Sequence, residues 1–243
     1  MKSWTRRDLT IVPLGLQHCI VVACDSCGAI GIKDGDILKL QSRYVAKFTT
    51  RVALTEVLCS GAVPVAITNG VACEMDPTGT EMIAGIKEEL INAGLADIAL
   101  SGSTEENFST SMTALAVTVI GAGLETDLKF GSAVKGDKLV LLGTPSVGAE
   151  VDLESKGFYE QINYLLPIPD VREIVPVGSK GVAYEAENLA SLSCAALELY
   201  NTGIDYFKSA GPVTCLLVLC DESIVSQVLS RYPSGVVIGE IRY

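Results

Sequence analysis

The stretch from Ile20 to Pro64 constrains the fold most, because it places acids beside strongly apolar segments. A hydrophobic run ends in Asp25, the polar turn that follows contains Asp36, and a long helical pattern contains Glu56. A carboxylate beside a buried strand, or on the apolar side of a helix, must be paired or bind a cation because its desolvation is costly. These acids therefore suggest a site for a metal ion and phosphate.

The composition is that of a folded protein with a sizeable core. The chain has 243 residues, of which 49% are hydrophobic and 19% charged, enough for one large domain or two small ones. The formal charge is −11 and the sequence pI is about 4.6, with no run of basic residues, so we expect no nucleic-acid partner. An acidic protein can still bind a nucleotide when Mg²⁺ lies between its carboxylates and the phosphates.

The eight cysteines lie mostly in apolar segments and lack the regular spacing of a disulfide-stapled domain. We interpret them as reduced thiols of a cytoplasmic protein. Cys24 and Cys27 have the spacing of a zinc or redox pair, which stays the alternative. However, His18 is the only histidine and no second cysteine pair accompanies them.

The N-terminus imitates a secretion signal, because Arg6 and Arg7 precede an apolar segment. Pro13, Gln17 and His18 interrupt that segment, and no other run approaches the ~18 apolar residues of a membrane span. We therefore expect a cytoplasmic protein that does not cross a membrane.

The hydrophobic pattern predicts alternating strands and helices, and thus an α/β (α+β) fold. In the first half we expect strands at 17–24, 63–73, 96–101 and 112–121, and helices at 43–60 and 80–93. After a break at 131–136, we expect strands at 137–143, 213–220 and 236–238, helices at 189–199 and 222–229, and a proline-rich loop at 167–176. The break predicts two subdomains, 1–130 and 131–243.

The helix predicted at 43–60 carries both apolar and charged positions. Phe48, Val52 and Glu56 follow one another at helical spacing, which places Glu56 on the side that should be buried. Lys47 and Arg51 lie on a neighbouring polar stripe. An ion pair of Glu56 with either cation is the alternative to a metal role, and a surface turn is the alternative for the acids at 34–36.

The common nucleotide and hydrolase motifs are missing from the sequence. It contains no G-x-x-x-x-G-K-[ST] phosphate loop, no strand-linked G-x-G-x-x-G and no G-x-S-x-G nucleophile elbow. His18, in an apolar strand, is a poor candidate for a general base. Any acid–base chemistry would therefore depend on carboxylates or on the substrate.

Three motifs in order resemble the aminoimidazole-ribonucleotide synthetase superfamily, which includes thiamine-monophosphate kinase and selenophosphate synthetase. They are VVACDS at 21–26, KDGDI at 33–37 and ALTEVLCSGAVPV at 53–65. In the second half, GDKLVLLG at 136–143, SAGPVTCLLV at 209–218 and VIGEI at 237–241 are similar to the second domain of this family. Each is a weak signal alone, but their order covers nearly the whole chain.

The resemblance implies a two-subdomain fold in which the N-terminal sheets of two protomers pair into a barrel across a homodimer. It implies that 1–130 binds ATP and Mg²⁺ and forms the dimer, whereas 131–243 completes the substrate site. Catalysis would then depend on positioning and charge neutralisation.

The resemblance also assigns roles to individual residues. Asp25, Asp36 and Glu56 are the expected Mg²⁺ ligands, and Asp25 and Lys33 the expected catalytic residues. The residues expected to bind ATP are Lys47, Arg51, and the 101–104 turn of Ser101, Gly102, Ser103 and Thr104, which would hold phosphate.

Among members of the superfamily, the short chain is most similar to α-ribazole kinase. This implies transfer of the γ-phosphoryl group of ATP to the 5′-hydroxyl of α-ribazole, a nucleoside of cobalamin lower-ligand salvage. Ser103 stands where the family has an aspartate. A thiamine-monophosphate-kinase-like or other ATP-dependent enzyme, and an ATP-binding regulator without catalysis, therefore stay open as alternatives.

Overall fold

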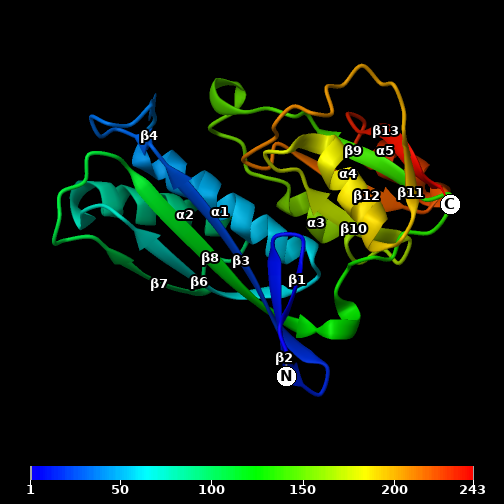
Figure 1. The fold of residues 1–243 in the computed structure, drawn as a ribbon, viewed down its shortest axis with the longest axis horizontal. Helices are drawn as coiled ribbons and strands as arrows, with labels where there is room; N and C mark the ends of the chain where they lie inside the picture. Colours follow the sequence, from blue (N-terminus) through cyan, green and yellow to red (C-terminus); the bar gives the residue numbers. More distant parts are fainter. Residues whose placement is uncertain (1, 243) are drawn as a thin grey trace. The chain divides into compact units, whose positions relative to one another are not determined.

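The computed structural model describes residues 2–242 and shows two compact units (Figure 1). The first unit contains the chain up to Leu58, then Ala62–Thr126 and the short segment Leu153–Gly157. The second contains Cys59–Gly61, Asp127–Asp152 and the chain from Phe158 onward. The roles expected of the two halves of the sequence stay predictions.

The first unit is built on a six-stranded sheet in the order β1-β2-β3-β8-β6-β7. Its strands are β1 (Trp4–Arg6), β2 (Leu9–Gly15), β3 (His18–Gly28), β8 (Ala114–Leu124), β6 (Val63–Val71) and β7 (Ala99–Thr104). All neighbours pair antiparallel except β6 and β7, which are parallel. Two very short strands, β4 (Ile30–Gly31) and β5 (Leu38–Lys39), form a separate parallel pair.

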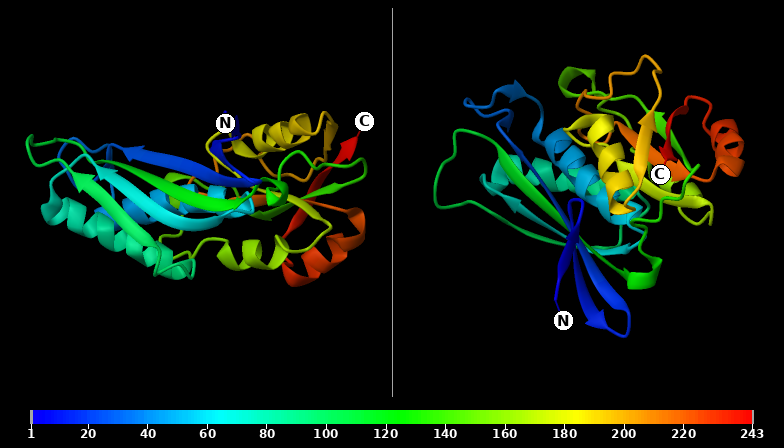
Figure 2. Two further views of the ribbon diagram at one scale, coloured as in Figure 1. Left: turned by 90° about the horizontal axis from the view of Figure 1, so that it is seen from below. Right: turned by 45° about the vertical axis from the view of Figure 1, so that its right-hand side comes forward.

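Two helices, α1 (Ser42–Cys59) and α2 (Thr80–Asn92), lie on one side of this sheet (Figure 2, left). Alternate residues of the strands face them, so that Val21, Val117 and Val119 are completely buried. A Cβ atom added to Gly85 of α2 would lie 2.0 Å from the carbonyl oxygen of Arg43, so only glycine allows α1 and α2 to approach this closely. The close approach brings the polar stripe of α1 against α2.

The second unit contains a five-stranded antiparallel sheet in the order β10-β12-β9-β13-β11. Its strands are β9 (Lys138–Gly143), β10 (Val171–Pro176), β11 (Ala196–Leu199), β12 (Cys215–Cys220) and β13 (Val236–Arg242). The helices are α3 (Tyr159–Leu165), α4 (Gly181–Leu192) and α5 (Val225–Arg231). Every residue of β12 is buried, as the apolar run at 213–220 predicts.

Three predicted segments are wrong, and each is a strand or contains one. The expected helix at 189–199 ends at Leu192, and Ala196–Leu199 is an edge strand paired with β13; Cys194, with φ of 53°, turns the chain between them. The expected loop at 167–176 contains β10, which pairs only with β12 and so tolerates Pro176 at its end. The expected turn at 101–104 is instead the last four of the six residues of β7.

The strand predicted at 17–24 is longer than expected. It continues as β3 to Gly28, because residues up to Gly28 pair with β8. Asp25 therefore lies within a strand and not after it.

Within residues 2–242, no helix is both long and apolar enough to span a membrane.

Candidate functional site

The sheet of the first unit fixes the position of Asp25. In the register of the strands, Asp25 pairs with Val117 of β8, Val117 pairs with Asn69 of β6, and Asn69 pairs with Gly102 of β7. Residues paired directly across a sheet point to the same face. Asp25 and Asn69 therefore face the helices, on the side where Val117 is completely buried.

Burial makes the charged form of Asp25 unfavourable. Burial is the largest cause of a rise in its pKa from 3.8 to about 6; the hydrogen bond to the backbone at Ser26 opposes this rise, and the charge of Asp8 adds to it. A nearby cation would reverse the shift, because an opposite charge favours the carboxylate form. Asp25 thus has the environment expected of an acid that binds a cation.

Asp36 holds a loop together. Its Oδ2 accepts hydrogen bonds from the backbone N–H of Lys33 at 2.8 Å and from the hydroxyl of Thr113 at 2.7 Å, and its Oδ1 accepts from the backbone N–H of Thr113 at 2.7 Å. Burial alone would raise the pKa of Asp36, but these hydrogen bonds outweigh it and lower the pKa. To bind a metal ion directly, Asp36 would have to give up some of these bonds.

Lys33 makes an ion pair with an acid of its own unit. Its Nζ lies 2.6 Å from Oε2 of Glu74, and Glu74 also accepts a hydrogen bond from the hydroxyl of Thr78. Burial raises the pKa of Glu74, but the bonds from Lys33 and Thr78 outweigh it and lower the pKa to about 2. The expected catalytic role of Lys33 would require this pair to open.

Glu56 lies towards the other end of the sheet from Asp25. A Cβ atom added to Gly121 would lie 2.5 Å from Cγ1 of Val57, so this part of α1 crosses the sheet at Gly121, whose partner on β3 is Val21. Asp25 is four residues further along β3, which corresponds to ~13 Å. Glu56 and Asp25 are thus not neighbours in the structure.

A Mg²⁺ ion needs several oxygen ligands arranged around one point. Within residues 2–242, no group of three or more His, Cys, Asp or Glu side chains is arranged to hold a metal ion. Within these residues, Asp25, Asp36 and Glu56 are thus not gathered into one cluster, and their roles as Mg²⁺ ligands stay predictions. Asp25 alone fits the arrangement in which Mg²⁺ is shared by one carboxylate and the phosphates of a nucleotide.

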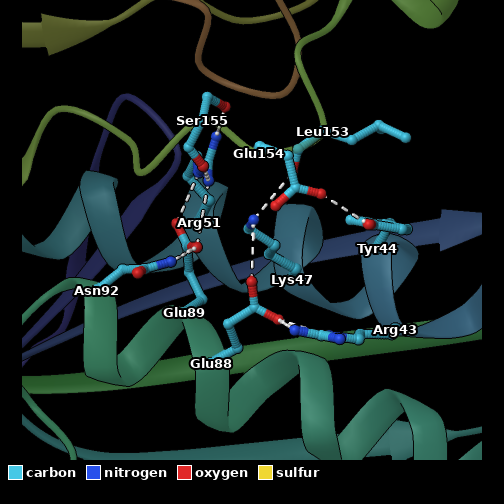
Figure 3. Close-up of polar contacts among 10 residues, drawn as sticks. All are labelled: Arg43, Tyr44, Lys47, Arg51, Glu88, Glu89, Asn92, Leu153, Glu154 and Ser155. Carbon is cyan, nitrogen blue, oxygen red and sulfur yellow. Dashed lines mark hydrogen bonds and ion pairs between the residues drawn. The ribbon is translucent and has the colours of Figure 1, made fainter.

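Lys47 is buried between α1 and α2 (Figure 3). Its Nζ lies 3.1 Å from Glu88 and donates a hydrogen bond of 2.9 Å to the backbone carbonyl of Leu153. Only 2% of its side chain is exposed. The alternative of a pair with Glu56 is therefore replaced by a pair with Glu88, and an ATP contact by Lys47 stays a prediction.

Arg51 has a similar environment one turn further along α1 (Figure 3). Its guanidinium lies 2.6 Å from Oε1 of Glu89, which is completely buried, and it also donates to the hydroxyl and the backbone carbonyl of Ser155. Segment 153–157 is thus bound to α1 through Lys47 and Arg51, the polar stripe that the sequence pattern shows. The predicted role of Arg51 in binding ATP would require this network to rearrange.

The predicted ATP-binding residues of β7 line a hollow. Its volume is about 300 Å³, and its walls come from Ser101–Thr104, Leu100 and Asn69 of the sheet, and from Met75, Ile83 and Lys87. Gly102 shares the face of Asn69, whereas Ser101 and Ser103 alternate to the opposite face. Residues 101–104 thus line a cavity, although they form an edge strand and not the expected turn. Their role in binding ATP stays a prediction.

Asn69 and Lys87 are lining residues that the sequence reasoning missed. Asn69 is 8% exposed and lies two residues from each of the buried Ile67 and Val71, on the same face of β6, so its inward position could have been inferred from the strand pattern. Lys87 is exposed on α2 and lies on the face that the helical pattern marks as polar. Two strand spacings of ~4.8 Å and the buried Val117 separate Asn69 from Asp25, so the hollow and Asp25 are distinct places on the sheet.

Comparison with known proteins gives structural neighbours only. No family model matches the chain, and no curated protein does. The structure of T. maritima PurL complexed with ADP matches with a TM-score of 0.72 and 14% identity over 99% of this chain and 42% of that chain. PurL complexed with ATP gives 0.70 and 15% over 96% of this chain and 42% of that chain. The E. coli hydrogenase maturation protein HypE gives 0.67 and 17% over 90% of this chain and 79% of that chain.

These structural matches show the fold of the chain, for which the sequence showed only a resemblance. The chain shares the aminoimidazole-ribonucleotide synthetase-like fold of PurL and HypE, which confirms the predicted fold class. It spans less than half of the length of PurL. No closed barrel forms within residues 2–242, and the expected barrel between two protomers stays a prediction.

Proposed function

We propose that this protein is an ATP-dependent enzyme that transfers the γ-phosphoryl group of ATP to a hydroxyl group of a small molecule. The observation that carries the proposal is the match of 99% of the chain to PurL in a structure that contains ADP. Further PurL structures, with ATP and with AMPPCP, match in the same way. Nucleotide binding is thus a property of PurL, one of the proteins with which this chain shares its fold.

The acceptor that we propose is the 5′-hydroxyl of α-ribazole, which gives α-ribazole 5′-phosphate. The support is the order of motifs from Asp25 through the 33–37 loop to the helix that carries Glu56. A thiamine-monophosphate-kinase-like reaction is the first alternative, because one fold can carry several ATP chemistries. The choice between them depends on the acceptor and not on the fold.

Phosphoryl transfer asks little covalent chemistry of the protein, because charge neutralisation and alignment supply most of the catalysis. Mg²⁺ held by Asp25 and the phosphates would neutralise negative charge at the transferred group. Asp25, which is half-buried, would be a residue that holds that ion. We assign no step to Glu56, since it is remote from Asp25.

A regulator that binds ATP without turning it over is a second candidate function. It is favoured by Ser103, which replaces an acidic residue expected from the family resemblance, and by the lack of a three-acid cluster within residues 2–242. A regulator needs nucleotide affinity alone, whereas an enzyme also needs a cation at the transferred phosphate.

We also propose that the protein forms a homodimer through the sheet face opposite α1 and α2. On that face Ile20, Val22 and Ile120 are half-exposed, and Val63 and Val65 at the start of β6 are 63% and 45% exposed. A contiguous apolar face of this kind is typical of an interaction surface. Sedimentation equilibrium would test this proposal, with a monomer at all concentrations as the contrary result.

The function can be tested with purified protein, ATP and Mg²⁺ in the presence of α-ribazole, and in parallel with thiamine monophosphate. ADP and the phosphorylated product are followed by mass spectrometry. We expect product from α-ribazole, at least about 100-fold less of it with Asp25→Asn, and full activity in the control Asp97→Asn, whose side chain is exposed on a turn.

Each outcome separates two of the candidates. Product from thiamine monophosphate alone would reject α-ribazole and keep the kinase. Binding of ATP without turnover of either acceptor would favour the regulator. The absence of ATP binding would reject the proposal as a whole.

A further inference from the structure

The hollow beside β7 suits the base of a nucleotide better than its phosphates. This inference rests on the proposed use of ATP. Its volume of about 300 Å³ lies at the lower end of the range for small-molecule sites. Met75, Ile83 and Leu100 give it apolar walls. Such walls favour a flat, uncharged group, because burial of apolar surface stabilises the complex, whereas burial of a phosphate would be costly.

The charges around the hollow point in the same direction. Thr104, in its wall, donates a hydrogen bond of 2.7 Å to Glu106, and the backbone N–H of Met75 donates to the same carboxylate oxygen at 2.8 Å. The exposed carboxylate of Glu106 therefore lies next to two lining residues, and its negative charge disfavours a phosphate beside them. Lys87 is the only cation among the lining residues, and within residues 2–242 it forms no ion pair.

Asn69 offers a donor and an acceptor at the floor of the hollow. Its Nδ2 donates one hydrogen bond, of 3.1 Å, to the carbonyl of Ser101, which leaves a second N–H, and within residues 2–242 its Oδ1 accepts none. A Cβ atom on Gly102 would lie 2.5 Å from both amide atoms, so the side chain lies flat against the glycine. An Asn amide matches the N6 and N7 edge of adenine with one donor and one acceptor.

The edge of the sheet adds backbone groups to this side chain. β7 is the last strand of the sheet and pairs only with β6, so part of its N–H and C=O groups remains available along the outer edge. Adenine has a donor and an acceptor side by side on its edge, and these can pair with a C=O and an N–H group of the strand. A polyphosphate would instead need several N–H groups that converge on one point, and an extended strand does not supply them.

We propose that the hollow between β7 and α2 is the subsite for the purine base of the nucleotide, with Asn69 reading the base edge and Met75, Ile83 and Leu100 packing against its faces. Ser101–Thr104 then bind the base and not the phosphates. Lys87 is available for one phosphate at the edge of the site.

The test compares the ligands adenosine, ATP and inorganic tripolyphosphate by isothermal titration calorimetry of the purified protein. We expect adenosine to bind and to compete with ATP, and tripolyphosphate to compete poorly. Ile83→Glu places a charge in the wall and should weaken adenosine and ATP at least tenfold. Ile91→Glu is the matched control, because Ile91 is 65% exposed on the same helix and does not line the hollow; its affinities should stay within about twofold. Thermal melting of both variants checks that they fold.

Different failures point to different errors. If ATP binds but adenosine does not, or if folded Ile83→Glu retains the wild-type affinity for ATP, the base subsite is wrong while the proposed use of ATP stands. If the wild-type protein binds neither ATP nor adenosine, both proposals are overturned. Stronger competition by tripolyphosphate than by adenosine would contradict the base subsite and favour binding of phosphate in the hollow.

Discussion

Replacement of Asp25 by Asn should make the protein more stable above pH 6, while it lowers the proposed ATP turnover at least about 100-fold. The raised pKa means that the folded state binds a proton more tightly than the unfolded chain does, between the unfolded value near 3.8 and the folded value of about 6. The favourable contribution of protonated Asp25 is therefore complete below pH 3.8 and is lost as the pH rises through 6. Above that pH the wild-type protein holds a desolvated carboxylate.

The size of the effect follows from the shift. A rise from 3.8 to about 6 corresponds to an upper limit of ~3 kcal/mol, at about 1.4 kcal/mol for each pKa unit. Since Asp25 is only half-buried, water screens part of this cost, and we expect a gain of about 1 to 2 kcal/mol in the free energy of unfolding at pH 8. Near pH 4 the gain should vanish.

Urea unfolding of wild-type and Asp25→Asn protein at pH 4 and pH 8, without nucleotide, measures this difference. A variant that is equally stable or less stable than wild type at pH 8 would refute the reasoning, because it would show that Asp25 is not desolvated. Asp97→Asn, which changes an exposed carboxylate, should show no such pH dependence.

Three further predictions concern the surrounding structure. Arg51→Met should lower the free energy of unfolding by about 3 kcal/mol in urea titrations, because the substitution removes the partner of a buried carboxylate. Arg43→Met, at an exposed pair, should change the free energy of unfolding little. Equal effects of the two substitutions would contradict the burial argument. Gly102→Ala should weaken ATP binding in calorimetry, since its Cβ would lie 2.5 Å from both amide atoms of Asn69 and would displace that side chain. Gly70→Ala, with open space at its Cβ, should not weaken binding, and equal affinities of the two variants would count against the hollow. Glu74→Gln should cost about 1 kcal/mol above pH 4.5, and the gap to wild type should close as the pH falls towards 2, since the carboxylate has its pKa lowered to about 2; a gap that is independent of pH would oppose this.

Much of the first unit could be predicted from hydrophobic periodicity. The helix expected at 43–60 is found at Ser42–Cys59, and the helix expected at 80–93 at Thr80–Asn92, because each has a continuous apolar stripe. Segments 101–104 and 189–199 were wrong because small polar residues and short apolar runs fit several structures. There, pairing with a neighbouring strand decided the outcome.

The candidate site was less predictable, since its residues come together only through pairing between distant strands. The burial of Asp25 could be inferred from the apolar run before it, and the structure agrees. The partners of Lys47 and Arg51 could not, because Glu88 and Glu89 meet them only where Gly85 lets α1 and α2 approach closely. The sequence shows that these cations form a stripe, but it does not show which acids lie opposite.

The most direct test of the account is a calorimetric titration of the purified protein with ATP in the presence of Mg²⁺. We predict saturable binding of about one ATP per chain, weakened when adenosine is present in excess. A titration with no binding up to about 1 mM ATP, equivalent to an affinity weaker than about −4 kcal/mol, would contradict the claim that this fold serves here to bind ATP.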